Sequence, residues 1–222
     1  MAPDILRPYA ALYWTFPVPW AGFNALPKDV DAAAAKSRTV RYQRDLVRAH
    51  VAAERGTLLK EFVFLETSPD HATDAYREVM AEILDLCGTR KVCLAYVDFA
   101  AKAGWRKHGR LAGAIEAHDL RTDPLHPRSI DVDGEPFSPD NHFREWRKVD
   151  EAFRQKRALT AREALAAAAD AIGPGYGRNV EIAARLNGTG VATHSGKAWT
   201  AENVRMALKN LETDEIAGPN PG

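Results

Sequence analysis

Residues 9–16 of this chain read YAALYWTF, and the run is closed by Pro17 and Pro19. All of its positions except Thr15 are apolar or aromatic, so the run has no polar face to turn toward solvent. Proline cannot donate to the hydrogen-bond ladder of a central strand, so the two prolines end the extended segment. The stretch predicts a strand that is buried on both faces and is followed by a loop.

Two further apolar runs follow this pattern, at Phe62–Leu65 and Val92–Val97. Apolar residues recur at helical spacing in the segments between and after these runs, over residues 39–55, 76–88 and 111–120. Strands that are apolar along their whole length and alternate with helices indicate a parallel sheet covered on both faces. We therefore predict a three-layer α/β domain over residues 1–150.

The composition is that of an ordinary globular protein. Of the 222 residues, 45% are hydrophobic and 27% are charged, unlike disordered or fibrous chains. No apolar run approaches the roughly 20 residues of a membrane-spanning helix, and Met1–Asp4 lacks the start of a secretory signal. Cys87 and Cys93 are too few for a disulfide scaffold or a four-ligand zinc site. We expect a cytoplasmic protein with reduced thiols and no cofactor.

Helical patterns continue in the second half of the chain. Phe143, Trp146, Val149 and Phe153 have the spacing of an amphipathic helix. The alanine-rich segment 161–171 predicts a second helix, which ends at residues 173–175, Gly-Pro-Gly. We interpret residues 151–175 as linking helices.

Residues 176–212 predict a pair of short helices. The first covers Asn179–Leu186, with Val180, Ala183 and Leu186 on one side. Thr189–Ser195 predicts a tight extended connector, after which Thr200 is placed to cap the second helix. That helix carries Ala201, Val204, Leu208 and Leu211 on one face and Glu202, Arg205, Met206 and Lys209 on the other. Two helices, a tight connector and exposed bases predict a helix-turn-helix unit.

Charge is distributed unevenly. The whole chain has 30 basic and 30 acidic residues, which gives no support for a uniformly basic surface. Residues 154–209 contain nine Lys or Arg against four Asp or Glu, a net charge of +5. Residues 213–222 combine acidic side chains with Gly and Pro and predict a disordered tail.

The string IAARLNGTGVAT at residues 182–193 continues through GKAWT at 196–200 to Val204 and Leu208. This pattern closely resembles the DNA-binding segment of serine recombinases and covers about 35 residues. The N-terminal half is similar, more loosely, to the resolvase-type catalytic domain of the same family. The resemblance implies a resolvase-like α/β domain that dimerises and a helix-turn-helix that binds double-stranded DNA.

The resemblance also implies where the family's catalytic residues belong. Its first strand carries an arginine and then the nucleophilic serine, and Thr15 and Pro17 hold those positions here. A later strand ends in an Asp-Arg pair with a second arginine three residues on, and this chain has Asp98, Phe99 and Lys102. Proline has no nucleophilic atom and phenylalanine no hydrogen-bond donor, so DNA cleavage by the family mechanism would be lost. We expect Pro17 and Asp98 to lie together at the carboxyl edge of the sheet.

Six residues of the C-terminal segment are candidates for DNA contact. An arginine can read guanine through two hydrogen bonds, and the amides at a helix start can bind phosphate. The candidates are Arg185, Lys197, Thr200, Glu202, Arg205 and Lys209, and Arg185 and Asn179 on the first helix are the weaker ones, for contact with the DNA backbone. We expect a homodimer that acts on DNA as a regulatory or accessory factor, alongside another recombinase or the transcription apparatus and away from membranes.

Two alternatives remain open from the sequence. One is an active DNA-processing enzyme, either a recombinase with a relocated serine, Ser37 or Ser68, or a metal-dependent nuclease. The nuclease would draw its metal ligands from residues 118–142, of which residues 118–141 predict a loop with one short strand at Ile130–Val132. Its candidate ligands are His118, His126, Asp131, Asp133 and His142. The other alternative is a protein-interaction module in which the helical unit packs against a partner protein.

Overall fold

The computed structural model describes residues 6–67, 73–89, 91–101 and 108–217. The chain divides into two compact units, residues 1–143 and residues 144–222. We describe each unit by itself.

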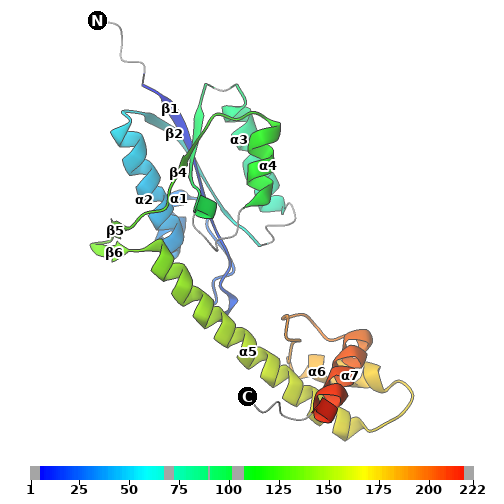
Figure 1. The fold of residues 1–222 in the computed structure, drawn as a ribbon. Coiled ribbons are helices and arrows are strands. Elements are labelled where there is room, and N and C mark those ends of the chain that lie inside the picture. Colours follow the sequence, from blue (N-terminus) through cyan, green and yellow to red (C-terminus); the bar gives the residue numbers. More distant parts are fainter. Residues whose placement is uncertain (1–5, 68–72, 90, 102–107, 218–222) are drawn as a thin grey trace, which may run out of the picture. The chain divides into compact units, whose positions relative to one another are not determined.

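The first unit contains a four-stranded sheet in which every neighbouring pair of strands is parallel, in the order β2-β1-β3-β4 (Figure 1). The strands are β1 (Pro8–Thr15), β2 (Thr57–Leu65), β3 (Cys93–Val97) and β4 (Thr122–Leu125). The three predicted apolar runs lie in β1, β2 and β3, which confirms the parallel sheet. The sequence pattern does not predict β4, because its TDPL segment is short and contains a proline, which an edge strand tolerates.

Helices cover both faces of the sheet, as predicted. They are α1 (Val30–Lys36), α2 (Arg38–Ala53), α3 (Asp74–Cys87) and α4 (Gly109–Ala117). The connection from β1 to β2 runs one way along the sheet, and the next two connections run the other way. Because parallel crossovers are right-handed, this reversal puts α2 on one face and α3 and α4 on the other (Figure 1).

The core centres on β1, where the stretch Tyr9–Tyr13 is fully buried. Val47 of α2 and Ile83 of α3 are likewise inaccessible to solvent and belong to the same cluster. Both cysteines are free and buried. Burial raises the pKa of the Cys87 thiol to about 11, so this side chain acts as a small apolar core residue.

A hairpin and a long helix follow the sheet. These elements are β5 (Ile130–Val132), β6 (Glu135–Phe137) and α5 (Pro139–Ile172). Asp133 and Gly134 form the hairpin turn with φ of 59° and 81°, the left-handed values that two-residue hairpin turns require. The 34 residues of α5 replace the two separate helices predicted around residues 143–153 and 161–171. The residues between those segments include no glycine or proline, so nothing interrupts the helix.

The second unit packs the C-terminal half of α5 against α6 (Arg178–Gly188) and α7 (Ala201–Ala217). Ile182 on α6 and Val204 on α7 are fully buried in its core. The spacing predicts Val180 on the buried side of α6, but Val180 is 61% exposed. Ile182 is fully buried on that helix instead. The helix α7 extends through Ala217, into the segment predicted to be a disordered tail, of which residues 218–222 lie outside the described residues. No helix in the described ranges combines the length and apolarity needed to cross a membrane.

Gln43 of α2 is fully buried and hydrogen-bonds the backbone of β1. Its Oε1 accepts from the N–H of Trp14 at 3.3 Å, and its Nε2 donates to the carbonyl of Trp14 at 2.7 Å. The pairing of β1 with β3 ends at Leu12, so Trp14 lies beyond that ladder. Gln43 therefore supplies the partners that a longer β3 would otherwise have provided.

We expect Gln43→Leu to lower the free energy of unfolding by about 1–3 kcal/mol, because buried backbone groups of Trp14 lose their partner at little change in side-chain volume. Urea denaturation followed by circular dichroism measures this difference. Gln155→Leu is the matched control, since Gln155 is exposed on α5 and, in the described part of the chain, hydrogen-bonds Glu151. An equal loss in both variants would contradict the role of Gln43.

Candidate nucleic-acid interface

The side chain of Asn187 links the end of α6 to the residue that precedes the cap of α7. Asn187, in the last turn of α6, donates to the carbonyl of Trp199 at 2.9 Å and accepts from the N–H of the same residue at 2.8 Å. Trp199 is buried in the cluster that contains Leu186 and Val204. The two hydrogen bonds therefore fix the end of α6 and the approach to α7 together.

The connector between the helices is tight, as predicted, but it is built from turns rather than extended backbone. Gly190 has φ of 74° and donates to the carbonyl of Asn187, and Val191 donates to the carbonyl of Leu186. This pair of hydrogen bonds is the usual way in which a left-handed glycine ends a helix. The chain thus reverses within a few residues of α6.

A second turn brings the connector to α7 and requires glycine. Gly196 has φ of 82° and donates to the carbonyl of Thr193 at 2.8 Å. A Cβ atom on Gly196 would lie 2.9 Å from Nη1 of Arg157, whose Nε donates to the carbonyl of His194. Arg157 therefore holds this turn next to α5.

Thr200 caps α7, as the sequence predicts. Its Oγ1 accepts from the N–H of Asn203 at 3.2 Å, and Oδ1 of Asn203 accepts from the N–H of Thr200 at 2.8 Å. This reciprocal pair satisfies two backbone donors at the helix start. The cap therefore fixes the residue at which α7 begins.

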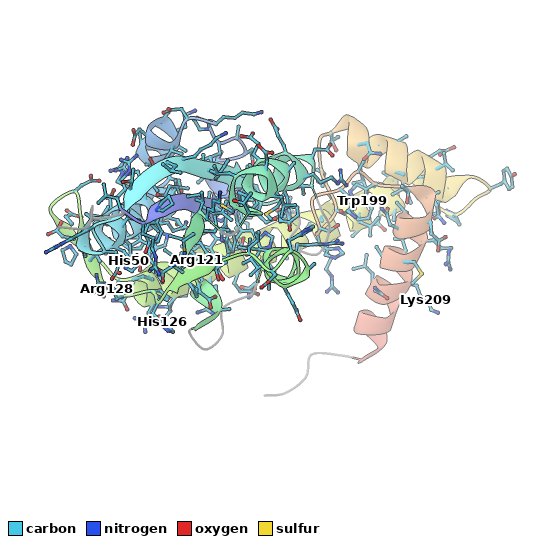
Figure 2. The ribbon with its side chains drawn as sticks, turned by 90° about the horizontal axis from the view of Figure 1, so that it is seen from above. His50, Arg121, His126, Arg128, Trp199 and Lys209 are labelled. Carbon is cyan, nitrogen blue, oxygen red and sulfur yellow. The ribbon has the colours of Figure 1, made fainter. Side chains whose placement is uncertain are left out.

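All six candidate DNA-contact side chains are exposed. They come from α6, the connector and α7: Arg185, Lys197, Thr200, Glu202, Arg205 and Lys209. On α7 the apolar residues Val204 and Leu208 pack into the core, while Arg205 and Lys209 face outward (Figure 2, where Lys209 is labelled). The predicted division of α7 into a buried and an outward face is confirmed. Asn179 is partly buried on α6.

An ion pair on the outward face of α7 is not predicted by the sequence reading. Nε of Arg205 donates to Oε2 of Glu202 at 3.0 Å, and Nη2 donates to Oε1 at 2.6 Å. The hydrogen bond from Arg205 lowers the pKa of Glu202, and the same contact raises the pKa of Arg205. The spacing i, i+3 between an acidic and a basic residue on a helix was the signal available for this pair.

At the carboxyl edge of the sheet lie the described residues that the resemblance assigned to catalytic positions, and they take part in packing and turn formation. β1 and β3 are adjacent and parallel, so Pro17 and Asp98 both follow strand ends at the same edge, as predicted. Thr15 closes β1, and its carbonyl accepts from the N–H of Glu66. Asp98 accepts from the N–H of Ala100 at 3.0 Å, which shapes the turn after β3.

Phe99 is buried at that edge. Its ring packs edge-on against Trp14 at 6.0 Å and against Phe143 at 5.4 Å between ring centroids. Lys102 lies outside the described residues. The phenyl ring of Phe99 carries no hydrogen-bond donor for a transition-state phosphate.

Beside these residues lies a cavity of about 210 Å³. Its walls include Trp14, Asp98, Phe99, His108 and Leu111. Of these, His108 belongs to a buried pair with Glu66, which follows β2, at 2.7 Å between Nε2 and Oε2. Sequence reasoning missed this pair, because nothing local marks two residues 42 positions apart as partners.

The ring of His108 is fully engaged. Its Nδ1 accepts from the N–H of Leu111 at 3.1 Å, so the ring proton lies on Nε2 and is donated to Glu66. The ring also stacks on Tyr76 at 5.5 Å between centroids. With both nitrogens and one face occupied, the pair joins β2 to α4 rather than presenting a base to a substrate.

Of the two alternative nucleophiles, the structure describes Ser37. Ser37 is buried and caps α2, with Oγ accepting from the N–H of Val40 at 3.3 Å. Ser68 lies outside the described residues. Ser37 thus has the capping role that a serine at the start of a helix usually has.

The proposed metal ligands do not converge. Among the described residues, no three His, Cys, Asp or Glu side chains are arranged to hold a metal ion. Asp133 pairs with Arg41, and Nε2 of His142 lies 3.2 Å from Oγ1 of Thr39. His118 follows the last turn of α4, while His126 and Asp131 are exposed. The nuclease alternative therefore has no assembled site in the described residues.

The pair formed by Glu66 and His108 should behave as a structural unit. We expect Glu66→Leu alone to cost about 1–3 kcal/mol of unfolding free energy, because it leaves the Nε2–H of His108 buried without this acceptor. Glu66→Leu combined with His108→Phe should recover most of the loss, since an apolar pair of similar volume is often neutral. Thermal and urea unfolding of the two variants measure this. A double variant no more stable than the single one would contradict it.

His142 should make stability depend on pH. Burial, and secondarily the charge of Arg38, lowers the pKa of His142 in the folded protein. The unfolded chain then binds the proton more readily, so stability falls as the pH drops below the ordinary histidine value of about 6.5. We expect His142→Gln to lose less unfolding free energy than the wild type between about pH 7.5 and 5.5. Equal losses in chemical denaturation across this range would contradict the lowered pKa.

Comparison of the chain with models of known protein families, with curated proteins and with solved structures returns no match.

Proposed function

We propose that this protein is a DNA-binding protein derived from a serine recombinase, that it does not cut DNA, and that it acts as a regulatory or accessory factor. Residues 178–211 are its helix-turn-helix, and α7 enters the major groove of duplex DNA. The resolvase-like α/β unit, residues 1–143, and the part of α5 that follows it serve to bring two protomers to one site.

The outward face of α7 carries this proposal. Glu202, Arg205 and Lys209 are exposed along one side, while Val204 is fully buried on the other. The helix has 17 residues and is about 25 Å long, and the major groove, about 12 Å wide, admits one helix.

Contacts around α7 fit phosphate binding. Lys197 is exposed in the turn before α7, and Arg185 is exposed on α6. Both cations flank the segment held by Asn187 and the cap at Thr200, so their backbone positions are fixed before DNA arrives. Fixed cations beside a recognition helix orient it on the phosphate backbone.

The carboxyl edge of the sheet favours a binding role over cleavage. Pro17 has no nucleophilic atom, Phe99 is part of an aromatic cluster, and Ser37 is a helix cap. The buried pair of Glu66 and His108 has its donors and acceptors within the protein. These residues support an α/β unit kept for assembly.

A stripe on α5 supports the homodimer. Trp146, Val149 and Phe153 recur at helical spacing, and in the described structure they join neither hydrophobic cluster. Val149 is 45% exposed. A second copy of the chain would cover this stripe.

Binding to random duplex DNA across a salt series tests the proposal. We expect Lys197→Ala to reduce the slope of log K against log salt by about 0.9, since one phosphate contact releases about that many counterions. Arg205→Ala should cost about 1–3 kcal/mol on a selected site and relax preference at one base pair. Fluorescence anisotropy with the full chain measures both effects.

Lys156→Ala is the matched control, because Lys156 is an exposed lysine on α5 outside the α6–α7 face. It should leave the salt slope unchanged. Absence of duplex binding by the wild type would overturn the proposal in favour of a protein-interaction module. Relaxation or nicking of supercoiled plasmid would overturn its non-cleaving part in favour of an enzyme.

A further inference from the structure

We infer that Glu202 determines the base preference of this protein by holding Arg205 in the orientation that reads guanine. The inference rests on the proposed DNA-binding function and assigns a positioning residue within it.

The contact between Glu202 and Arg205 is bidentate. Nε and Nη2 of Arg205 each donate to a different carboxylate oxygen, at 3.0 and 2.6 Å. Two parallel hydrogen bonds fix the plane of the guanidinium as well as its position. A single contact would leave that plane free to rotate.

The remaining donors of Arg205 are left for a ligand. Nη1 has no acceptor within the described part of the chain, and the further contact of Nη2 is to the sulfur of Met206 at 3.3 Å. A thioether is a weak acceptor that a base edge readily displaces. The Nη1 and Nη2 pair matches the O6 and N7 acceptors of guanine in the major groove.

Glu202 is itself held near its place. It is the second residue after the cap at Thr200, where a carboxylate is stabilised by the unpaired amides of the helix start. Its charge also repels phosphates, so it disfavours placing this part of α7 against the DNA backbone. An arginine without this partner would be free to pair with a phosphate of any sequence.

Glu202 thus lowers the affinity for duplex DNA of any sequence and raises the selectivity for guanine. With Glu202 present, Arg205 is kept from the phosphates and presented to a base edge. Without it, Arg205 adds one phosphate contact, and guanine loses its advantage. The two effects have opposite signs, which separates this role from a simple loss of folding.

The test is selection from a duplex library with random base pairs, using the full chain, followed by anisotropy on the selected and random duplexes. The wild type should enrich guanine at one position and prefer it by about tenfold or more. Glu202→Gln should reduce that preference severalfold, raise affinity for random duplex, and steepen the salt slope by about 0.9. In an Arg205→Ala background, Glu202→Gln should cause no further change in base preference.

Glu181→Gln is the matched control, since Glu181 is an exposed glutamate in the first turn of α6. It removes the same charge from the same unit and should leave guanine preference intact. If Glu202→Gln keeps the wild-type preference, or changes it in the Arg205→Ala background as well, the inference is overturned while DNA binding stands. If the wild type binds no duplex, the proposed function fails first.

Discussion

The first strand can be stable only in the middle of a sheet, because Tyr9–Tyr13 place apolar side chains on both of its faces and all of them are buried. Parallel neighbours on each side and helices above and below are the arrangement that meets this need. The reversal of strand order beside β1 then sends α2 to one face and α3 to the other. Gln43 completes the same strand where its neighbour β3 ends. Much of the first unit is therefore a consequence of burying one run of residues.

Periodicity predicts an element when the pattern of its own side chains shows which of its faces is buried. The runs in β1, β2 and β3, the helices between them and the outward face of α7 were of this kind, and so was the cap at Thr200. Periodicity fails where an element depends on a partner far along the chain. β4 has too little apolar character of its own, and Val180 lies on a helix whose buried side is set by packing against α5 and α7. The continuity of α5 was missed because two apolar patterns looked like two helices.

The features of the candidate site fall into the same two groups: those that the sequence pattern predicts and those that it does not predict. The exposed cations of the helical unit follow from helical spacing and charge. Three contacts depend instead on side-chain geometry. They are the hydrogen bonds of Asn187 to Trp199, the pair of Glu66 and His108, and the bidentate contact of Glu202 with Arg205. Glu66 and His108 are separated by 42 residues in sequence and meet only because β2 and α4 pack together. Phe99 illustrates a related point: its contacts with Trp14 and Phe143 make it part of the core, so an arginine at this position would lose that packing.

The joint between α6 and α7 has an evolutionary consequence. Asn187 bonds the backbone of Trp199, Thr200 caps with its own hydroxyl, and Gly190 and Gly196 set the turns by their backbone angles. None of these contacts uses the outward side chains of α7. Mutations at Glu202, Arg205 or Lys209 can therefore accumulate with little effect on folding. Under the proposed function, descendants of one gene can diverge in the DNA sites they bind while inheriting the same scaffold.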